Sequence, residues 1–303
     1  MDTFLRLVQV PGPSWEERPI ADVIKQEVAS LGFQAHEDDV AEEIGGNSGN
    51  LIVNIPGNTP GAPSLLFAAH MDTVPLAVGV RPVVRDGVIV TDGTTALGGD
   101  NRAGVSEILE AVREVKEHNL PHGDLQLLFT VAEEGGLVGA RALDPGLIHS
   151  DFAYAVDVFK ANQIYTQGQH LLIDPPELDL TPEGVARAKQ AAEHAPVIPP
   201  EHLRLDQNEK RILDFTTGAM QDIGLVPEFR RIEWAGTDAI ALRRKGINAI
   251  SLGAGENRPH STEERMEIQD LVNSTRLVRS LIARAAASAA VGGPAGAALA
   301  LVD

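Results

Sequence analysis

Five short apolar runs alternate with segments of helical periodicity, and this alternation constrains the fold more than any other feature of the chain. The runs are LIVNI (51–55), SLLFAA (64–69), LQLLFTV (125–131), FAYAV (152–156) and INAISL (247–252). Their length and apolar character are typical of strands that are covered on both faces. Strands that alternate with helices predict an α/β protein with a mixed, mostly parallel sheet flanked by helices on both faces.

Three helical segments lie before, between and after these runs. The clearest covers residues 102–117, and a similar apolar stripe between Ile268 and Ile282 predicts the last helix. An earlier stripe over residues 20–31 follows Ser14 and Glu17, whose spacing resembles a capping box. These helices supply the layers that a buried sheet needs.

Composition excludes several classes of function. The 303 residues carry a formal net charge of −18, which argues against a nucleic-acid backbone or an anionic membrane surface as partner. The chain has no cysteine, so disulfides, thiolate metal sites and cysteine nucleophiles are excluded. Any metal must therefore be held by histidine and carboxylate.

The two ends of the chain bear on localisation. The start, MDTFLRLVQVPG, does not have the pattern of a secretory signal, and this predicts a cytoplasmic protein. Near the other end, Arg284, Gly292, Gly293 and Pro294 interrupt an Ala-rich stretch of modest hydrophobicity. We therefore expect residues 285–303 to be a flexible Ala/Gly-rich tail and not a membrane span.

Polar side chains follow the apolar runs at the points where strands would end. They are His70 and Asp72, Asp100, Glu133 and Glu134, Asp157, and His260. Taken singly, such residues are usually a hydrogen-bonded structural histidine, a solvated turn or a helix N-cap. Together they would place uncompensated charge on one rim of the sheet, where ligands of α/β proteins gather. Divalent cations give these side chains a reason to converge.

The motifs that carry these residues resemble those of a known family. HMDTV, GGDNRAG, AEEGG, AVD and PHSTEE occur in that order, and WAGTDA (234–239) is a sixth. They are similar to the motifs of the two-zinc exopeptidases and deacylases that include peptidase T, glutamate carboxypeptidase and acetylornithine deacetylase. The resemblance covers residues 1–157 and 207–283.

The resemblance implies two divalent metal ions, zinc in the first place, with cobalt or manganese as alternatives. It implies that Asp100 bridges the two ions. His70 and Asp157 would complete one site, and Glu134 and His260 the other.

Two further acids receive catalytic roles from the same resemblance. Asp72 would orient His70 and raise its basicity, since both face the same way on a strand of period two. Glu133 is adjacent to a ligand but is not one, and it would be the general base.

The chain departs from the family pattern where members carry an inserted lid domain. We predict a catalytic domain over residues 1–284, in which 158–206 is a short segment in place of the lid. The lid forms the family's dimer, so we expect a monomer or a dimer unlike the family's. His170, His194 and His202 lie in the short segment, and none of them is assigned a role.

A second departure is Asn101, which stands where the family commonly has a second acid. The family also has a cis peptide bond at this point. Because the first acid is the bridging one, the asparagine should matter little.

The leading hypothesis is a dinuclear metal-dependent hydrolase of peptide bonds in small peptides, most like an aminopeptidase of the peptidase T kind. An alternative is an N-acyl-amino-acid deacylase or amidohydrolase with the same metal site. A second alternative is a metal-binding or scaffold protein without activity that has lost its lid. Retention of Glu133 argues against the scaffold, because a structural metal site does not need a base.

Overall fold

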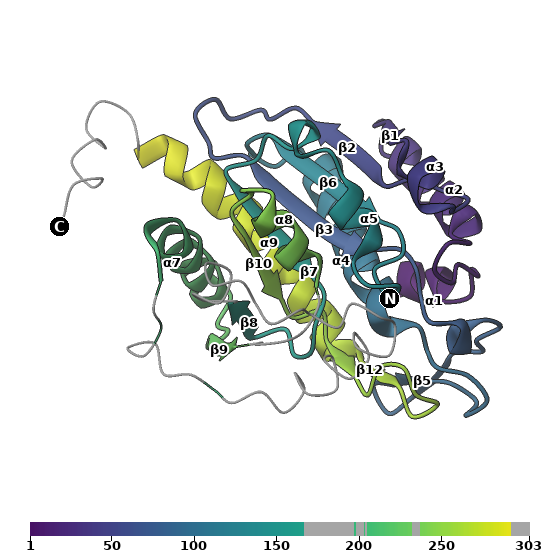
Figure 1. Ribbon diagram of the computed structural model, residues 1–303. Helices are drawn as coiled ribbons and strands as arrows, with labels where there is room; N and C mark the ends of the chain where they lie inside the picture. Colours follow the sequence, from purple (N-terminus) through teal and green to yellow (C-terminus); the bar gives the residue numbers. More distant parts are fainter. Residues whose placement is uncertain (167–196, 198–202, 204, 232–236, 292–303) are drawn as a thin grey trace.

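An eight-stranded mixed sheet forms the centre of the molecule (Figure 1). The computed structural model describes residues 1–166, 197, 203, 205–231 and 237–291. The strand order of the eight-stranded sheet is β1-β2-β6-β3-β7-β10-β8-β9. The strands are β1 (Ala35–Glu37), β2 (Leu51–Ile55), β3 (Leu65–His70), β6 (Leu125–Thr130), β7 (Phe152–Val156), β8 (Gln163–Thr166), β9 (Glu228–Arg231) and β10 (Ala249–Leu252).

The four central strands β6, β3, β7 and β10 are parallel, whereas β1 with β2, β2 with β6, and β8 with β10 pair antiparallel. This arrangement confirms the predicted mixed, mostly parallel sheet. All five predicted strands are present, with boundaries that differ by two residues at most. Because the central strands are parallel, their carboxyl ends lie at one edge, and the polar residues that follow them meet there.

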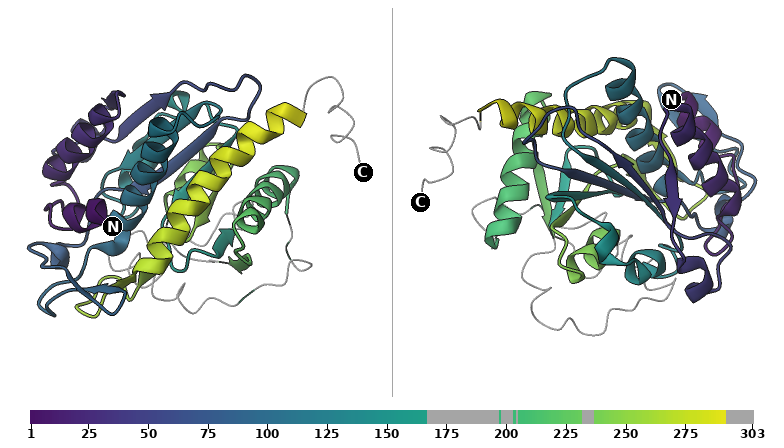
Figure 2. Two further views of the ribbon diagram at one scale, coloured as in Figure 1. Left: turned by 180° about the vertical axis from the view of Figure 1, so that it is seen from behind. Right: turned by 90° about the horizontal axis from the view of Figure 1, so that it is seen from above.

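Helices cover both faces of the sheet (Figure 2). Phe67 and Ala69 of β3 belong to one core cluster with residues of α4 and α9, whereas Leu66 and Ala68 belong to another with residues of α8. This alternation follows from the period of two along a strand. The helices are α1 (Asp2–Leu7), α2 (Arg18–Ser30), α3 (Val40–Ile44), α4 (Gly99–Glu117), α5 (Val138–Ala142), α7 (Gln207–Asp222), α8 (Asp238–Arg244) and α9 (Ile268–Val291).

A second, smaller sheet supports one side of the rim. Its order is β11-β12-β5-β4, and all three of its pairings are antiparallel. Its strands are β4 (Val83–Arg85), β5 (Val88–Val90), β11 (Glu256–Asn257) and β12 (Arg265–Glu267). The turn between β11 and β12 contains His260, so this sheet fixes the turn that carries the last predicted ligand.

Two predicted boundaries are corrected by the structure. Helix α9 continues to Val291, and Ala285 and Ala286 at its end are buried, so a tail that begins at residue 285 is wrong. The segment 158–206 likewise includes β8, which pairs with β10 inside the main sheet.

The described residues do not include His170, His194, His202 or residues 292–303. Among the described helices, none is long and apolar enough to cross a membrane.

Gly104 allows α4 to lie directly against the end of β7. A Cβ atom at this position would be 2.1 Å from the carbonyl oxygen of Val156 and 2.5 Å from Oδ1 of Asn101. We expect Gly104→Ala to lower the free energy of unfolding by about 1–3 kcal/mol, because the helix must move away from the sheet. Urea denaturation measures this effect. Gly46→Ala is the control, because its nearest atom is 3.4 Å away, and equal losses in both variants would contradict the explanation.

Candidate metal centre

The structure brings all five predicted ligands, and Glu133, to one place at the carboxyl edge of the sheet. Three groups of side chains each place one potential ligand atom per residue within 4.8 Å of one another. The groups are His70, Asp100 and Asp157; Asp100, Glu134 and His260; and His70, Glu133 and Glu134. Asp100 belongs to the first two groups, which is the position that a bridging ligand requires.

The two carboxylate oxygens of Asp100 face two different imidazoles. Oδ1 is 2.9 Å from Nε2 of His70, and Oδ2 is 3.0 Å from Nε2 of His260. The same His260 nitrogen is 2.7 Å from Oε1 of Glu134. The second carboxylate of the first group is close as well, since Oδ1 of Asp157 is 3.9 Å from Nε2 of His70. Each imidazole thus faces Asp100 and at least one further acid.

The backbone at the start of α4 sets the direction of Asp100. Asp100 and Asn101 have non-helical dihedral angles, and the peptide bond between them is cis. Nδ2 of Asn101 donates to the carbonyl of Val156 at 2.9 Å, and its Oδ1 accepts from the amide of Gly104 at 2.9 Å. Asn101 therefore ties the helix to β7, and its amide group supplies a donor that an ionised acid lacks.

Glu264 holds the other side of this turn, and sequence reasoning missed it. Its two oxygens accept hydrogen bonds from the backbone amides of Gly98 and Asp100, at 2.9 and 3.0 Å. Burial and the nearby charge of Asp100 raise the pKa of Glu264 to about 7. Glu264 is the last residue of the PHSTEE motif, four residues after His260. Its position in this motif is the sequence signal that could have identified it.

Asp72 orients more of the site than the sequence indicated. The ring nitrogen Nδ1 of His70 lies 3.1 Å from the carbonyl oxygen of Asp72 and 3.3 Å from its Oδ1. The carboxylate also accepts from the backbone amides of Glu133 and Glu134, at 3.0 and 3.1 Å, and from the hydroxyl of Ser14 at 2.7 Å. Burial would raise the pKa of Asp72, but these partners, His70 first, hold it below its ordinary value. One carboxylate thus positions a ligand and the adjacent Glu133–Glu134 pair.

The predicted capping box of Ser14 and Glu17 is wrong. Helix α2 begins at Arg18 without a side-chain cap, and Ser14 bonds to Asp72 instead. Glu17 is fully buried, and its Oε1 accepts from the backbone amides of Trp15 and Ala132. Both side chains therefore tie the N-terminal segment to the rim. Burial, and then the charge of Asp72, raise the pKa of Glu17 to about 7.

We expect Glu17→Gln to change how stability depends on pH. The pKa of Glu17 is about 7 in the folded protein and 4.5 ordinarily. Between these values the folded state holds a proton that the unfolded state releases, so the contribution of Glu17 is full below about pH 4.5 and is lost as the pH rises to about 7. Glutamine keeps an acceptor for both amides and does not titrate. Relative to wild type, the free energy of unfolding of the variant should therefore increase by on the order of 3 kcal/mol as the pH rises from 4.5 to 8.

Urea denaturation of the metal-free protein across this pH range measures the difference. Glu16→Gln is the matched control, because Glu16 is exposed beside Glu17. A difference between Glu17→Gln and wild type that stays constant with pH would contradict the titration of Glu17.

Asp238 is a further buried acid that belongs to the GTDA motif but received no role from the sequence. Its carboxylate accepts a hydrogen bond from the hydroxyl of Thr130, which is paired with His70 across β3 and β6. Burial raises the pKa of Asp238 to about 7, and the charges of Asp157 and Asp72 contribute. Asp238 is thus a further buried carboxyl group close to the rim, and it is mostly protonated below about pH 7.

The donor set fits divalent metal ions. Imidazole nitrogen and carboxylate oxygen are the ligands that zinc and related cations take in the absence of thiolates. The carboxylates of Asp100, Glu133, Glu134 and Asp157 are all at most 5% exposed. Such a concentration of buried acids is costly without cations. Burial would lower the pKa of His260, but Glu134 and Asp100 raise it to about 10. A proton on His260 therefore compensates part of the negative charge of these acids when no metal is bound.

Glu133 has the geometry of a base beside the ligands. Its side chain is fully buried, and its Oε2 lies 3.9 Å from Nε2 of His70. It does not belong to either group that contains Asp100, although it forms the third group with His70 and Glu134. A carboxylate in this position can take a proton from a water that lies between it and the ligands.

Comparisons with known proteins show the family and the fold of this chain. A model of Peptidase family M20/M25/M40 matches residues 66–284. The protein YqjE of Bacillus subtilis is 41% identical over 157 residues, which cover 52% of this chain and 42% of that protein. Peptidase T of Shewanella woodyi is 31% identical over 190 residues, with 52% of this chain and 44% of that enzyme covered. This chain therefore spans less than half the length of these curated relatives.

Solved structures share the fold. Aminopeptidase PepT from Bacillus cereus superposes with a TM-score of 0.79 at 25% identity, over 94% of this chain and 97% of that one. A tripeptidase from Staphylococcus aureus superposes with a TM-score of 0.78 at 24% identity, over the same shares. Because the family model covers most of the sequence, this chain belongs to Peptidase family M20/M25/M40.

Proposed function

We propose that this chain is a dinuclear metal-dependent hydrolase of peptide bonds in small peptides, of the aminopeptidase kind. The observation that carries this proposal is Asp100, whose two oxygens face the imidazoles of His70 and His260. The family and the similarity to peptidase T support peptides as the substrate class. The proposed ligands are His70 and Asp157 for one ion, Glu134 and His260 for the other, and Asp100 for both.

The side chains of the site have different roles in the proposed hydrolysis. Two divalent cations, which we propose to be zinc, would supply Lewis acidity toward the scissile carbonyl and the attacking water. Glu133 takes the proton of that water and gives it to the leaving amine. Asp72 keeps His70 in the tautomer whose Nε2 faces Asp100, and it holds the backbone of Glu133 in place.

The test is turnover of a substrate panel by the zinc-, cobalt- or manganese-loaded chain. Dipeptides and tripeptides with a free amino end should be hydrolysed, and a chelator should abolish the activity. The panel includes N-acyl amino acids. Hydrolysis of these in place of peptides would favour the deacylase, and no turnover of any amide would contradict the proposal.

A further inference from the structure

Trp15 is a large apolar residue that the fold leaves 37% exposed. Its φ angle is 68°, in the left-handed region, where a bulky residue is an outlier and glycine is the ordinary choice. Its amide donates to Oε1 of Glu17 at 2.8 Å, and its carbonyl accepts from the amide of Asn47 at 3.1 Å. The chain therefore fixes an indole group at a position whose backbone favours glycine. Such an outlier points to a role beyond local structure.

The hydrogen bond to Glu17 also places Trp15 at the rim of the sheet. The same oxygen of Glu17 accepts from the amide of Ala132 at 2.9 Å. Ala132 directly precedes the Glu133–Glu134 pair in the sequence. The backbone of Trp15 thus lies beside the turn that carries the proposed base and one of the proposed ligands.

The indole ring contacts the next residue of this turn, Gly135. A Cβ atom at Gly135 would be 2.5 Å from Cη2 and 2.8 Å from Cζ2 of the ring. Gly135 directly follows the proposed ligand Glu134, so the edge of the ring lies within about 8 Å of the Cα atom of Glu134. One residue of an extended peptide spans about 3.3–3.6 Å. A side chain next to the scissile bond of a peptide held at the metal centre therefore reaches the indole.

The exposed part of the indole is an apolar surface. Among the residues that the structure describes, neither another aromatic ring nor a cation stacks on it. An apolar side chain gains free energy by leaving water for such a surface, and an aromatic one gains more through the contact between the rings. The chemistry of Trp15 thus favours a large apolar partner.

We propose that Trp15 determines specificity by receiving a large apolar or aromatic side chain from a residue next to the scissile bond of the substrate. The substrate side chain packs on the exposed part of the indole, and Gly135 leaves room for the ring on the turn behind it. This inference rests on the proposed peptidase function and narrows its substrates to peptides with such a residue at that bond.

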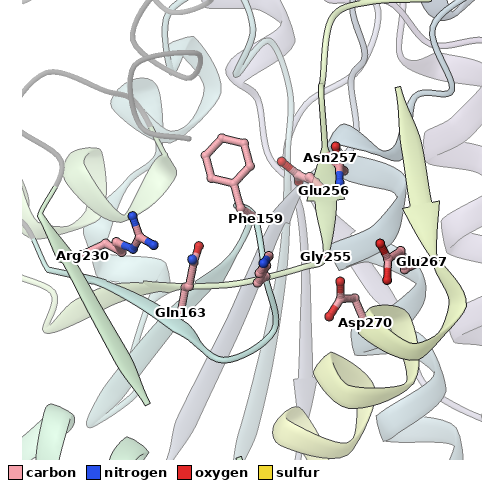
Figure 3. A pocket seen from close by; sticks show the side chains of 9 residues that line it. Phe159, Gln163, Arg230, Gly255, Glu256, Asn257, Glu267 and Asp270 are labelled. Atoms are coloured by element: carbon pink, nitrogen blue, oxygen red, sulfur yellow. The ribbon is translucent and has the colours of Figure 1, made fainter. Parts of the chain in front are cut away.

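A pocket around Phe159 is the rival location for this side chain (Figure 3). It has a volume of about 430 Å³ and contains neither Trp15 nor a proposed ligand. Phe159 is only 6% exposed, and the lining includes the carboxyl groups of Glu267 and Asp270. An apolar side chain there would remove water from polar groups without replacing their hydrogen bonds, which is unfavourable. The indole is therefore the better partner for an apolar side chain.

Binding to a chain that does not turn over provides the test. The zinc-loaded Glu133→Gln variant is titrated calorimetrically with phenylalanyl-glycyl-glycine and alanyl-glycyl-glycine, which differ by one phenyl group. The same pair with the variable residue in second position is also used. In at least one position the phenylalanine peptide should bind about tenfold or more tightly than its alanine partner. Equal affinities in both positions, or tighter binding of the matching lysine peptides, would overturn the inference.

Substitutions of Trp15 then locate the preference. Trp15→Gly should bring the ratio of the two affinities close to one and leave the alanine peptide unchanged, because the backbone at this position suits glycine. Trp15→Phe should keep part of the preference. Val226→Ala is the control for loss of an exposed apolar side chain, because Val226 is 78% exposed between α7 and β9. Equal losses of affinity for both peptides in Trp15→Gly would mean that the indole only supports the turn, and would refute the assignment.

A second variant moves the ring without removing it. The Cβ atom added by Gly135→Ala requires the indole to shift, so this substitution should reduce the phenylalanine preference. In a chain that already carries Trp15→Gly it should have no further effect on the ratio. Equal effects in both backgrounds would contradict the contact between the ring and Gly135. A preference that survives Trp15→Gly but is lost in Phe159→Leu would place the side chain in the rival pocket and refute the inference.

The outcomes separate this inference from the proposed function. If the active chain hydrolyses phenylalanine and alanine peptides equally well and binds them equally, the assignment of Trp15 fails and the peptidase stands. If no peptide is hydrolysed but the ratio of affinities depends on Trp15, the peptidase fails and the indole stands as a binding site for apolar side chains.

Discussion

Glu133→Gln should lower kcat by about 10²- to 10⁴-fold while the metal content stays that of the wild type, because a general base contributes rate and not metal affinity. The substitution removes the proton acceptor and keeps the shape of the side chain. The Glu133 amide that bonds to Asp72 is unaffected, so the turn should keep its geometry. Steady-state kinetics on a tripeptide and metal analysis of the same sample measure the two quantities.

The adjacent residue provides the matched control. Glu134→Gln makes the same chemical change one position along, but Glu134 contacts His260 and is a proposed ligand. This variant should lose metal, and its activity should recover in part when the metal concentration is raised. If Glu133→Gln lost metal and Glu134→Gln lost only rate, the two roles would have to be exchanged.

Asp100→Ala should remove both metal ions and reduce turnover below detection. Asp100 is the one residue shared by the group around His70 and Asp157 and the group around Glu134 and His260. His70→Ala should instead reduce the metal content to about one ion per chain, since the second group stays complete. The measurement is elemental analysis after reconstitution with excess zinc and dialysis.

Asp214→Ala controls for the general loss of an acid, because Asp214 is exposed on α7. It should keep the wild-type metal content. If Asp100→Ala retained one tightly bound ion, Asp100 would not be a bridging ligand. A wild-type chain that is fully active with a single ion would contradict the dinuclear mechanism itself.

The strands and the polar residues at their ends could be predicted from the sequence because both signals are local. A run such as FAYAV is recognisable by its length and apolar character, and the acid after it, Asp157, is the next residue. The parallel order of the central strands then brings these ends together. The convergence of candidate ligands at strand ends is therefore the most predictable part of such a site.

The supporting residues could not be predicted, because their partners are distant in sequence. Ser14 bonds to Asp72, 58 residues away, and Glu264 bonds to Asp100, 164 residues away. The residues around Ser14 are typical of a helix cap, but in the folded chain the Ser14 hydroxyl bonds to Asp72 instead. The end of α9 was missed for a similar reason. Its Ala285 is buried by packing, which an Ala-rich sequence does not indicate.

Because buried acids converge at the rim, we expect the melting temperature of this protein to rise with the concentration of free metal. An ion that binds only the folded state stabilises it by mass action, by about 2.7 kcal/mol at a concentration one hundred times its Kd. Two such ions would contribute twice that amount, a large fraction of the stability of an ordinary domain. In an environment depleted of metal, the same chain would spend more of its time unfolded and exposed to proteolysis. Metal supply would thus set the abundance of the protein as well as its activity.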